Sequence, residues 1–130
     1  MFTPVNFKIS KLLKEEGFDE NCEQGYNGAF EPFHIGLVDF SFPQKNSELF
    51  ESAYTAPIIA RVLMYLYNKY GIWITPWMAS ERSWGFHILK TSDGYVLARN
   101  TRLSNSPTEA YEEAIAHYLE NFINKKKQEA

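Results

Sequence analysis

Apolar and polar positions in the last third of the chain follow a pattern that is typical of three strands. Short apolar runs occur at residues 71–74, 84–88 and 95–98, and successive side chains of the second run point to opposite faces. Asp93 and Gly94 separate the last two runs, and both residue types tolerate the positive φ that tight hairpin turns require. The pattern predicts three consecutive strands, the last two joined as a hairpin.

The segment after these runs predicts an amphipathic helix. Ser106 and Glu109 have the spacing of a capping box at its start. Apolar side chains then recur with the helical period, and the face that they form is expected to be buried. They are Tyr111, Ala114, Ile115, Tyr118, Leu119, Phe122 and Ile123.

Two further helices are predicted upstream. Residues 7–16 have an apolar and a basic face, with Asn6 as the N-cap and Gly17 as a left-handed end. Residues 55–70 form a second helical pattern with Pro57 near its first turn, where a missing N–H is harmless. Apolar side chains outside its main stripe predict that this helix is covered on more than one side, by the first part of the chain or by a partner.

The region between these two helices is predicted to contain a loop and a strand. Residues 19–31 are acidic and contain glycine, which indicates a loop or a loop leading into a strand. Residues 33–42 resemble a strand whose second half alternates between a buried and a solvated face. Residues 43–47 are polar and are predicted to form a turn.

Together these elements predict an α+β fold. We expect an antiparallel sheet of three to four strands packed against two main helices, with an extra N-terminal helix. A length of 130 residues is close to the modal size of one domain. We therefore expect a single domain over residues 1–130, with residues 55–124 as its helix–strand–strand–strand–helix core.

Composition narrows the functional classes. Aromatic residues make up 16% of the chain, and such a surplus favours a binding face, although an aromatic-rich core would also account for it. The net charge of −3 argues against binding to nucleic acid through charge alone. That charge is uneven: residues 1–53 carry four Lys/Arg and nine Asp/Glu (−5), and residues 54–130 carry nine and seven (+2). The single cysteine and the absence of a long apolar stretch predict a cytoplasmic protein without a membrane span.

Catalytic chemistry is not indicated by the sequence. His34, His87 and His117 do not have the spacing of metal ligands, and acidic neighbours would disfavour a reactive thiolate at Cys22. Paired carboxylates lie in polar contexts, and no glycine-rich phosphate loop occurs. We expect no catalytic residue, no metal site and no cofactor, and so a protein that is not an enzyme.

One cluster is a candidate binding site. It combines cationic and aromatic side chains on or beside the predicted strands, and the candidate binding residues are Arg82, Trp84, Tyr95, Arg99 and Arg102. Lys90, Trp73 and Trp77 are interleaved with them. A sheet face with Arg and aromatic side chains can stack on bases or hold a peptide. In the alternative interpretation, the aromatic rings face the helices and the cations are solvated at the outer edge.

Three segments resemble a family of short proteins encoded in prophages and mobile elements of gut bacteria. They are residues 56–74, beginning Ala-Pro and ending Tyr-Gly-Ile-Trp-Ile, residues 107–115 (Pro-Thr-Glu-Ala-Tyr-Glu-Glu-Ala-Ile) and residues 16–22 (Glu-Gly-Phe-Asp-Glu-Asn-Cys). The resemblance implies an uncharacterised, phage-related accessory protein and assigns no functional residue. The helix–strand–strand–strand–helix order is also similar to that of double-stranded-RNA-binding domains. Those domains have a basic start to the last helix, where this chain has Glu109, Glu112 and Glu113.

The functional expectation that follows is a non-enzymatic module that binds another protein or itself. The alternative is a nucleic-acid-binding module that uses the aromatic and arginine side chains of the sheet.

Overall fold

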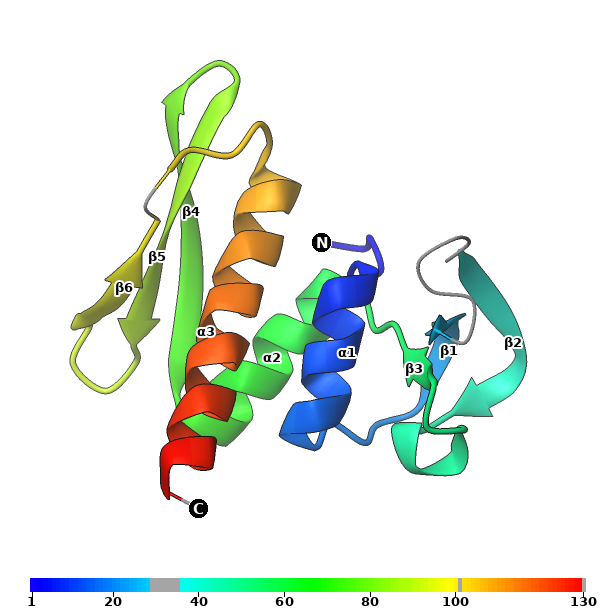
Figure 1. The fold of residues 1–130 in the computed structure, drawn as a ribbon. Helices are drawn as coiled ribbons and strands as arrows, with labels where there is room; N and C mark the ends of the chain where they lie inside the picture. The colour runs from blue at the N-terminus through cyan, green and yellow to red at the C-terminus, as the bar shows by residue number, and fades with distance from the viewer. Residues whose placement is uncertain (29–35, 101, 130) are drawn as a thin grey trace. The chain divides into compact units, whose positions relative to one another are not determined.

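The protein has an α+β fold, as the sequence predicted (Figure 1). The structure, a computed structural model, describes residues 1–28, 36–100 and 102–129. Its main elements in chain order are α1 (Phe7–Glu16), β1 (Cys22–Asn27), β2 (Leu37–Gln44), a 3₁₀ turn (Asn46–Glu48), β3 (Ala53–Thr55), α2 (Ile59–Tyr70), β4 (Ile72–Ser80), β5 (Ser83–Lys90), β6 (Val96–Arg99) and α3 (Pro107–Glu129). The strands form two antiparallel three-stranded sheets, of which the sequence predicted the second.

The chain divides into two compact units. The first comprises Met1–Thr3 and Ile59–Tyr118, and the second comprises Pro4–Ile58 and Leu119–Ala130. The boundary falls within α3, so that this helix contributes its first part to one unit and its last part to the other. This division into two units does not test the expectation of one domain over residues 1–130, which stays a prediction.

The first unit is built on the sheet β4-β5-β6. Its order α2-β4-β5-β6-α3 is the predicted helix–strand–strand–strand–helix order. Gly71 and Gly94 end α2 and the β5–β6 turn at φ values of 66° and 74°, where a glycine avoids the steric cost of a Cβ. The ring of His117 on α3 lies 6.2 Å from that of Phe86, so the first part of α3 covers one face of this sheet (Figure 1).

Helix α3 begins as the sequence predicted. Ser106 Oγ accepts a hydrogen bond from the Glu109 backbone N–H at 3.1 Å. The Glu109 carboxylate accepts one from the backbone N–H of Asn105 at 2.9 Å, one residue before the position of an ideal capping box. The predicted apolar face is also confirmed, since Ala114, Ile115 and Leu119 are fully buried.

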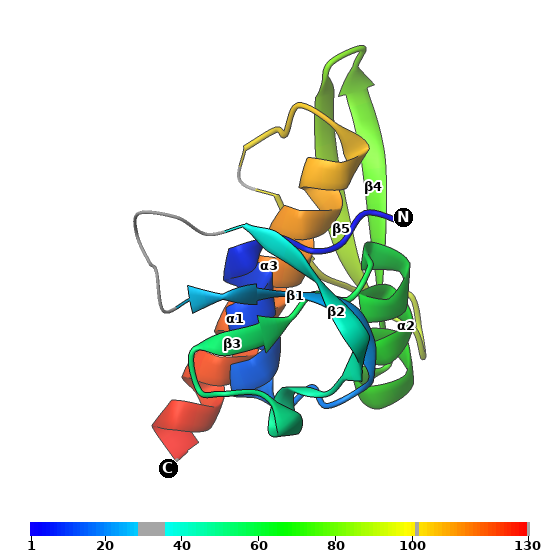
Figure 2. The ribbon, with the colours of Figure 1, turned by 90° about the vertical axis from the view of Figure 1, so that its right-hand side faces the viewer.

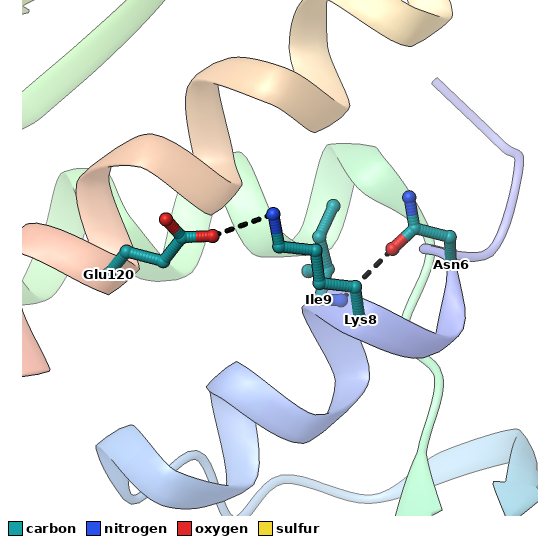
Figure 3. Close-up of polar contacts among 4 residues, drawn as sticks. All are labelled: Asn6, Lys8, Ile9 and Glu120. Carbon is teal, nitrogen blue, oxygen red and sulfur yellow. Dashed lines mark hydrogen bonds and ion pairs between the residues drawn. The ribbon is translucent and has the colours of Figure 1, made fainter. Parts of the chain in front are cut away.

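The second unit begins with α1, whose ends follow from local chemistry. Asn6 Oδ1 accepts a hydrogen bond from the Ile9 backbone N–H at 2.9 Å (Figure 3). At the other end Gly17 adopts φ 110°, and the Phe18 N–H donates to Leu13 O at 2.9 Å, which satisfies a free helix carbonyl. Phe18 and Leu13 are both buried, as expected for this type of helix ending.

An ion pair joins α1 to the last part of α3 within this unit. Lys8 Nζ lies 2.7 Å from Glu120 Oε1 (Figure 3). Both side chains keep considerable exposure, 66% and 43%. Exposed pairs of this kind contribute about 1 kcal/mol or less, so the pair orients side chains more than it stabilises the fold.

The sheet of the second unit was missed or misplaced by the sequence prediction. Its order is β2-β1-β3, with β1 in the centre (Figure 2). Residues 22–27, which were predicted to lie in a loop or in a loop leading into a strand, form β1, because long-range pairing overrides the weak strand propensity of Gln24 and Gly25. The predicted strand over residues 33–42 is observed from Leu37, and residues 33–35, with His34, lie outside the described residues.

Three further features of this region differ from the prediction. Strand β2 continues to Gln44, into the segment that was predicted to turn. Its expected buried face is largely solvent-exposed, since Phe42 is 66% exposed. Thr55, which was predicted to start a helix, ends β3, and α2 begins only at Ile59.

Acid sensitivity of the second unit is expected to depend in part on Asp19. Its Oδ1 accepts a hydrogen bond from the Ser47 backbone N–H at 2.8 Å, and this bond lowers the pKa of the carboxyl below its ordinary value of 3.8. A lowered pKa in the folded state contributes stability that is present above the unfolded value and is lost as the pH falls through the folded value.

In Asp19→Asn the amide oxygen can still accept the bond but does not titrate. Urea midpoints between pH 5 and pH 2 should therefore fall less steeply below about pH 4 for Asp19→Asn than for the wild type. Parallel curves for the two proteins would contradict this role.

Candidate functional site

The face of β4-β5-β6 opposite α3 carries exposed aromatic side chains. In β4, Ile72 and Ile74 are buried, whereas the intervening Trp73 is 38% exposed and Trp77 is 37% exposed. Successive side chains of a strand point to opposite faces, so the two indoles share the face that looks away from the core. An apolar surface of this kind on a small protein calls for a functional explanation.

Cross-strand register shows which side chains share this face. Trp73 pairs with Leu89, and Trp77 pairs with Gly85. His87 stands opposite Thr75 on one side and Arg99 on the other. Directly paired residues of antiparallel strands lie on the same face, so aromatic, apolar and cationic side chains meet here.

Gly85 allows Trp77 to lie flat across the sheet. A Cβ on Gly85 would be 2.5 Å from Trp77 Cε2 and Cζ2, which means that the indole covers the glycine backbone. The same indole lies 6.1 Å from the His87 ring, with an angle of 31° between the planes. Close contact with both neighbours limits the rotamers that Trp77 can adopt, and a preorganised aromatic side chain loses little entropy on binding.

The exposed surface continues onto α2. The rings of Tyr67 and Trp73 are in edge contact, with centroids 6.0 Å apart and planes at 89°. Tyr67 is 44% exposed, and Met64, about one turn earlier, is 47% exposed. These are two of the apolar side chains outside the main stripe of α2, and the chain leaves both accessible. We call the surface formed by Tyr67, Trp73, Trp77, His87, Leu89 and Arg99 the aromatic face.

The residues of the predicted binding cluster are distributed along the sheet. Arg82 lies in the β4–β5 turn, and Trp84 follows on the face of β5 that carries the buried Phe86. Arg102 lies near the same end, two residues before Ser104, which bridges to Trp84. Arg99 alone belongs to the aromatic face.

Tyr95 lies at the other end of the sheet. Its carbonyl accepts a hydrogen bond from the Lys90 N–H at 2.8 Å, and Lys90 is the last residue of β5. Trp84 and Lys90 are six positions apart, which corresponds to about 20 Å along a strand. The structure therefore brings Arg82, Trp84 and Arg102 to one end and leaves Tyr95 at the other.

The sequence placed Trp77 among the aromatic residues of the cationic cluster and Leu89 on the same strand face as His87, but it did not join these residues in one surface. The alternation of Trp73, Thr75 and Trp77 was the available signal, but Pro76 interrupts it and suggests that the strand has ended. Pro76 is tolerated because β4 is an edge strand. The register with β5 could not be read from the sequence.

Outside this face, the described residues offer little for metal binding, thiol chemistry or membrane insertion. Within residues 1–28, 36–100 and 102–129, no three His, Cys, Asp or Glu side chains are placed to hold a metal ion together. Cys22 is buried, and its thiol lies 3.5 Å from Glu20 O. No helix in the described part of the chain has the length and apolar character needed to cross a membrane.

Comparisons with known proteins do not add a relative. The resemblance of residues 16–22, 56–74 and 107–115 to mobile-element proteins stays a prediction, and the candidate site rests on its own geometry. No protein-family model matches this chain, and neither does any curated protein or solved structure.

Proposed function

We propose that the protein is a non-enzymatic binding module that holds another protein on its aromatic face. The observation that carries this proposal is the exposure of Tyr67, Trp73 and Trp77, with Tyr67 and Trp73 in ring contact and Arg99 paired with His87 on the same face of the sheet. Trp, Tyr and Arg are the residue types that contribute most to binding at protein interfaces. The proposed setting is the cytoplasm, in a phage-related accessory role, since a lone cysteine suits a reducing compartment.

The charge of this face favours a protein over a nucleic acid. Arg99 is the only Lys or Arg among its six residues, whereas phosphate binding requires several clustered cations. Glu109, Glu112 and Glu113 at the start of α3 further disfavour the arrangement of a double-stranded-RNA-binding domain. The arginines at the end of the sheet, Arg82 and Arg102, lie outside this face.

The open edge of β4 is less suitable than the face for recruiting a partner. The Phe86 N–H donates to Asn100 Oδ1 at 2.9 Å, and Phe86 O accepts from the Asn100 N–H at 3.3 Å. Since both backbone groups of Phe86 point toward Asn100, the opposing Pro76 directs its backbone away from β5. A proline there removes one donor from the open edge, a common protection against strand addition. We therefore place the partner on the face and not on the edge.

Trp77→Ala should weaken the complex strongly. Truncation of an interface hot spot costs about 2 kcal/mol or more, which is roughly a 30-fold loss of affinity. A partner is first identified by affinity capture from an extract of the source organism, then purified and titrated by calorimetry against each variant. Thermal unfolding of each variant ensures that only folded proteins are compared.

Phe2→Ala provides the matched control, because Phe2 is 85% exposed in the same unit but is not part of the aromatic face. Its affinity should equal that of the wild type. Equal affinity of Trp73→Ala, Trp77→Ala and Phe2→Ala would show that the face is not the binding site. A captured nucleic acid whose affinity falls steeply with salt would favour the alternative function.

A further inference from the structure

The regular pairing of the edge strand β2 with β1 is interrupted in the middle of β2. Gln44 pairs with Cys22 and Asp39 pairs with Gln24, so residues 40–43 stand opposite Glu23 alone. A bulge of this size bends the strand, and β2 is visibly curved in Figure 1. Bulges of this kind redirect side chains and often lie next to functional surfaces.

The side chains of Phe40 and Phe42 have different environments at the bulge. A Cβ on Gly25 would be 2.4 Å from Phe40 Cζ, so the ring of Phe40 covers the backbone of the central strand. Phe42 is 66% exposed, and Phe50, on the segment that follows the 3₁₀ turn, is 87% exposed. The first ring anchors the bulge, and the other two are available to a ligand.

Two open hollows share the bulged segment. One, of about 510 Å³, is lined by Asp39, Phe40, Ser41, Phe42, Gln44, Glu48, Leu49 and Phe50. The other, of about 530 Å³, is lined by Glu23, Gln24 and residues 39–43. Phe42 lines both hollows, and we call them together the β2 groove.

The charge of the β2 groove has one sign. Its lining residues include Glu23, Asp39 and Glu48 and no Lys or Arg. Asp39 Oδ1 accepts a hydrogen bond from Gln24 Nε2 at 2.8 Å, and Glu48 Oε1 accepts one from the Lys45 N–H at 2.9 Å. Since an ionised carboxylate has about four acceptor sites, both groups keep capacity for a further donor.

We propose that the β2 groove binds an arginine side chain carried by an extended segment of a partner protein. A guanidinium stacks on aromatic rings and pairs with carboxylates through a planar fork of donors, and it is more weakly hydrated than the ammonium group of lysine. Phe42, Phe50, Asp39 and Glu48 offer both kinds of contact within one hollow. A phosphate backbone would be repelled by the same carboxylates. This site belongs to the second unit, and its proposal does not depend on that for the aromatic face.

The test uses a capped peptide, Gly-Leu-Arg-Leu-Gly, and the same peptide with citrulline in place of arginine. Citrulline keeps the shape of arginine and removes its charge. Both are titrated into the isotopically labelled full-length protein, and the backbone amide signals are followed by NMR. We expect the arginine peptide to shift the signals of Phe42 and Glu48 and to bind at least about 10-fold more tightly than the citrulline peptide, as the loss of charge-assisted hydrogen bonds implies.

Two charge-removing substitutions sharpen the test. Asp39→Asn and Glu48→Gln keep an oxygen that can accept the existing bonds from Gln24 and Lys45, and together they should weaken binding of the arginine peptide about 10-fold or more. Glu81→Gln, which removes one negative charge from the exposed β4–β5 turn, should leave the affinity unchanged. The NMR spectrum of each variant also shows whether it is folded.

Three results would overturn the proposal. One is equal binding of the two peptides, and another is an unchanged affinity of the Asp39→Asn/Glu48→Gln protein. The third is a dimer in sedimentation equilibrium that Phe42→Ala dissociates, because the groove would then hold a second copy of this chain. If the double variant does not fold, the comparison of the two peptides on the wild type still decides.

Discussion

Replacing Leu119 by alanine is expected to lower the free energy of unfolding by about 2–5 kcal/mol. Leu119 is fully buried on α3, so the substitution removes apolar contacts and leaves a cavity that its neighbours fill only in part. A typical domain is stable by about 5–15 kcal/mol, and the loss would be a large share of that. Urea denaturation followed by circular dichroism measures it directly.

Asn124→Ala is the control for this prediction. Asn124 lies on the same helix and is exposed, and its substitution also ends in alanine. Its stability should stay within about 0.5 kcal/mol of the wild type. Equal midpoints for Leu119→Ala and Asn124→Ala would mean that the buried face of α3 is wrongly assigned.

Gly25→Ala is expected to destabilise the second unit by about 1–3 kcal/mol or more, as overpacking does in a close-packed core. Gly25 is buried in the central strand β1, and an added Cβ would lie 2.4 Å from the backbone carbonyl oxygen of Tyr54 and 2.4 Å from Phe40 Cζ. A side chain can turn away, but the carbonyl belongs to β3, which pairs with β1 at this point. Relief therefore requires the two strands to separate, and the denaturation midpoint should fall.

Gly36→Ala tests whether the close approach is the cause. Within the described part of the chain, nothing lies within 4 Å of a Cβ built on Gly36, and Gly36 is not among the glycines with a positive φ. The substitution should be neutral or should stabilise by about 0.4–1 kcal/mol, because alanine restricts the unfolded chain. A similar loss of stability in both variants would mean that the effect comes from a general property of glycine and not from the packing of Phe40 and Tyr54 against Gly25.

Both ends of α1 and the start of α3 followed from residues close together in the sequence, whereas the start of α2 did not. Asn6 caps α1, Gly17 ends it in the left-handed region, and Ser106 caps α3. These interactions span three or four residues, so the same side chains make them in almost any tertiary context. The β5–β6 turn at Gly94 belongs to the same class, since its φ of 74° is a local property.

The central strand of the second unit could not be predicted in the same way. Gly25 suggests a loop when only its neighbours in the sequence are considered. In the structure it pairs with Val38 on β2 and Thr55 on β3, and the ring of Phe40 covers it. A glycine is suitable here because backbone and ring approach too closely for any side chain.

Both candidate sites depend on this kind of long-range information. The aromatic composition and the amphipathic helices were evident in the sequence, because period and residue type are local properties. The pairing of Trp77 with Gly85 and of His87 with Arg99, which creates the aromatic face, is a matter of register between strands. The same is true of the bulge that exposes Phe42, since a bulge exists only relative to a partner strand. Tertiary structure alone decides such pairings, because cross-strand partners are chosen by packing between segments far apart in the chain.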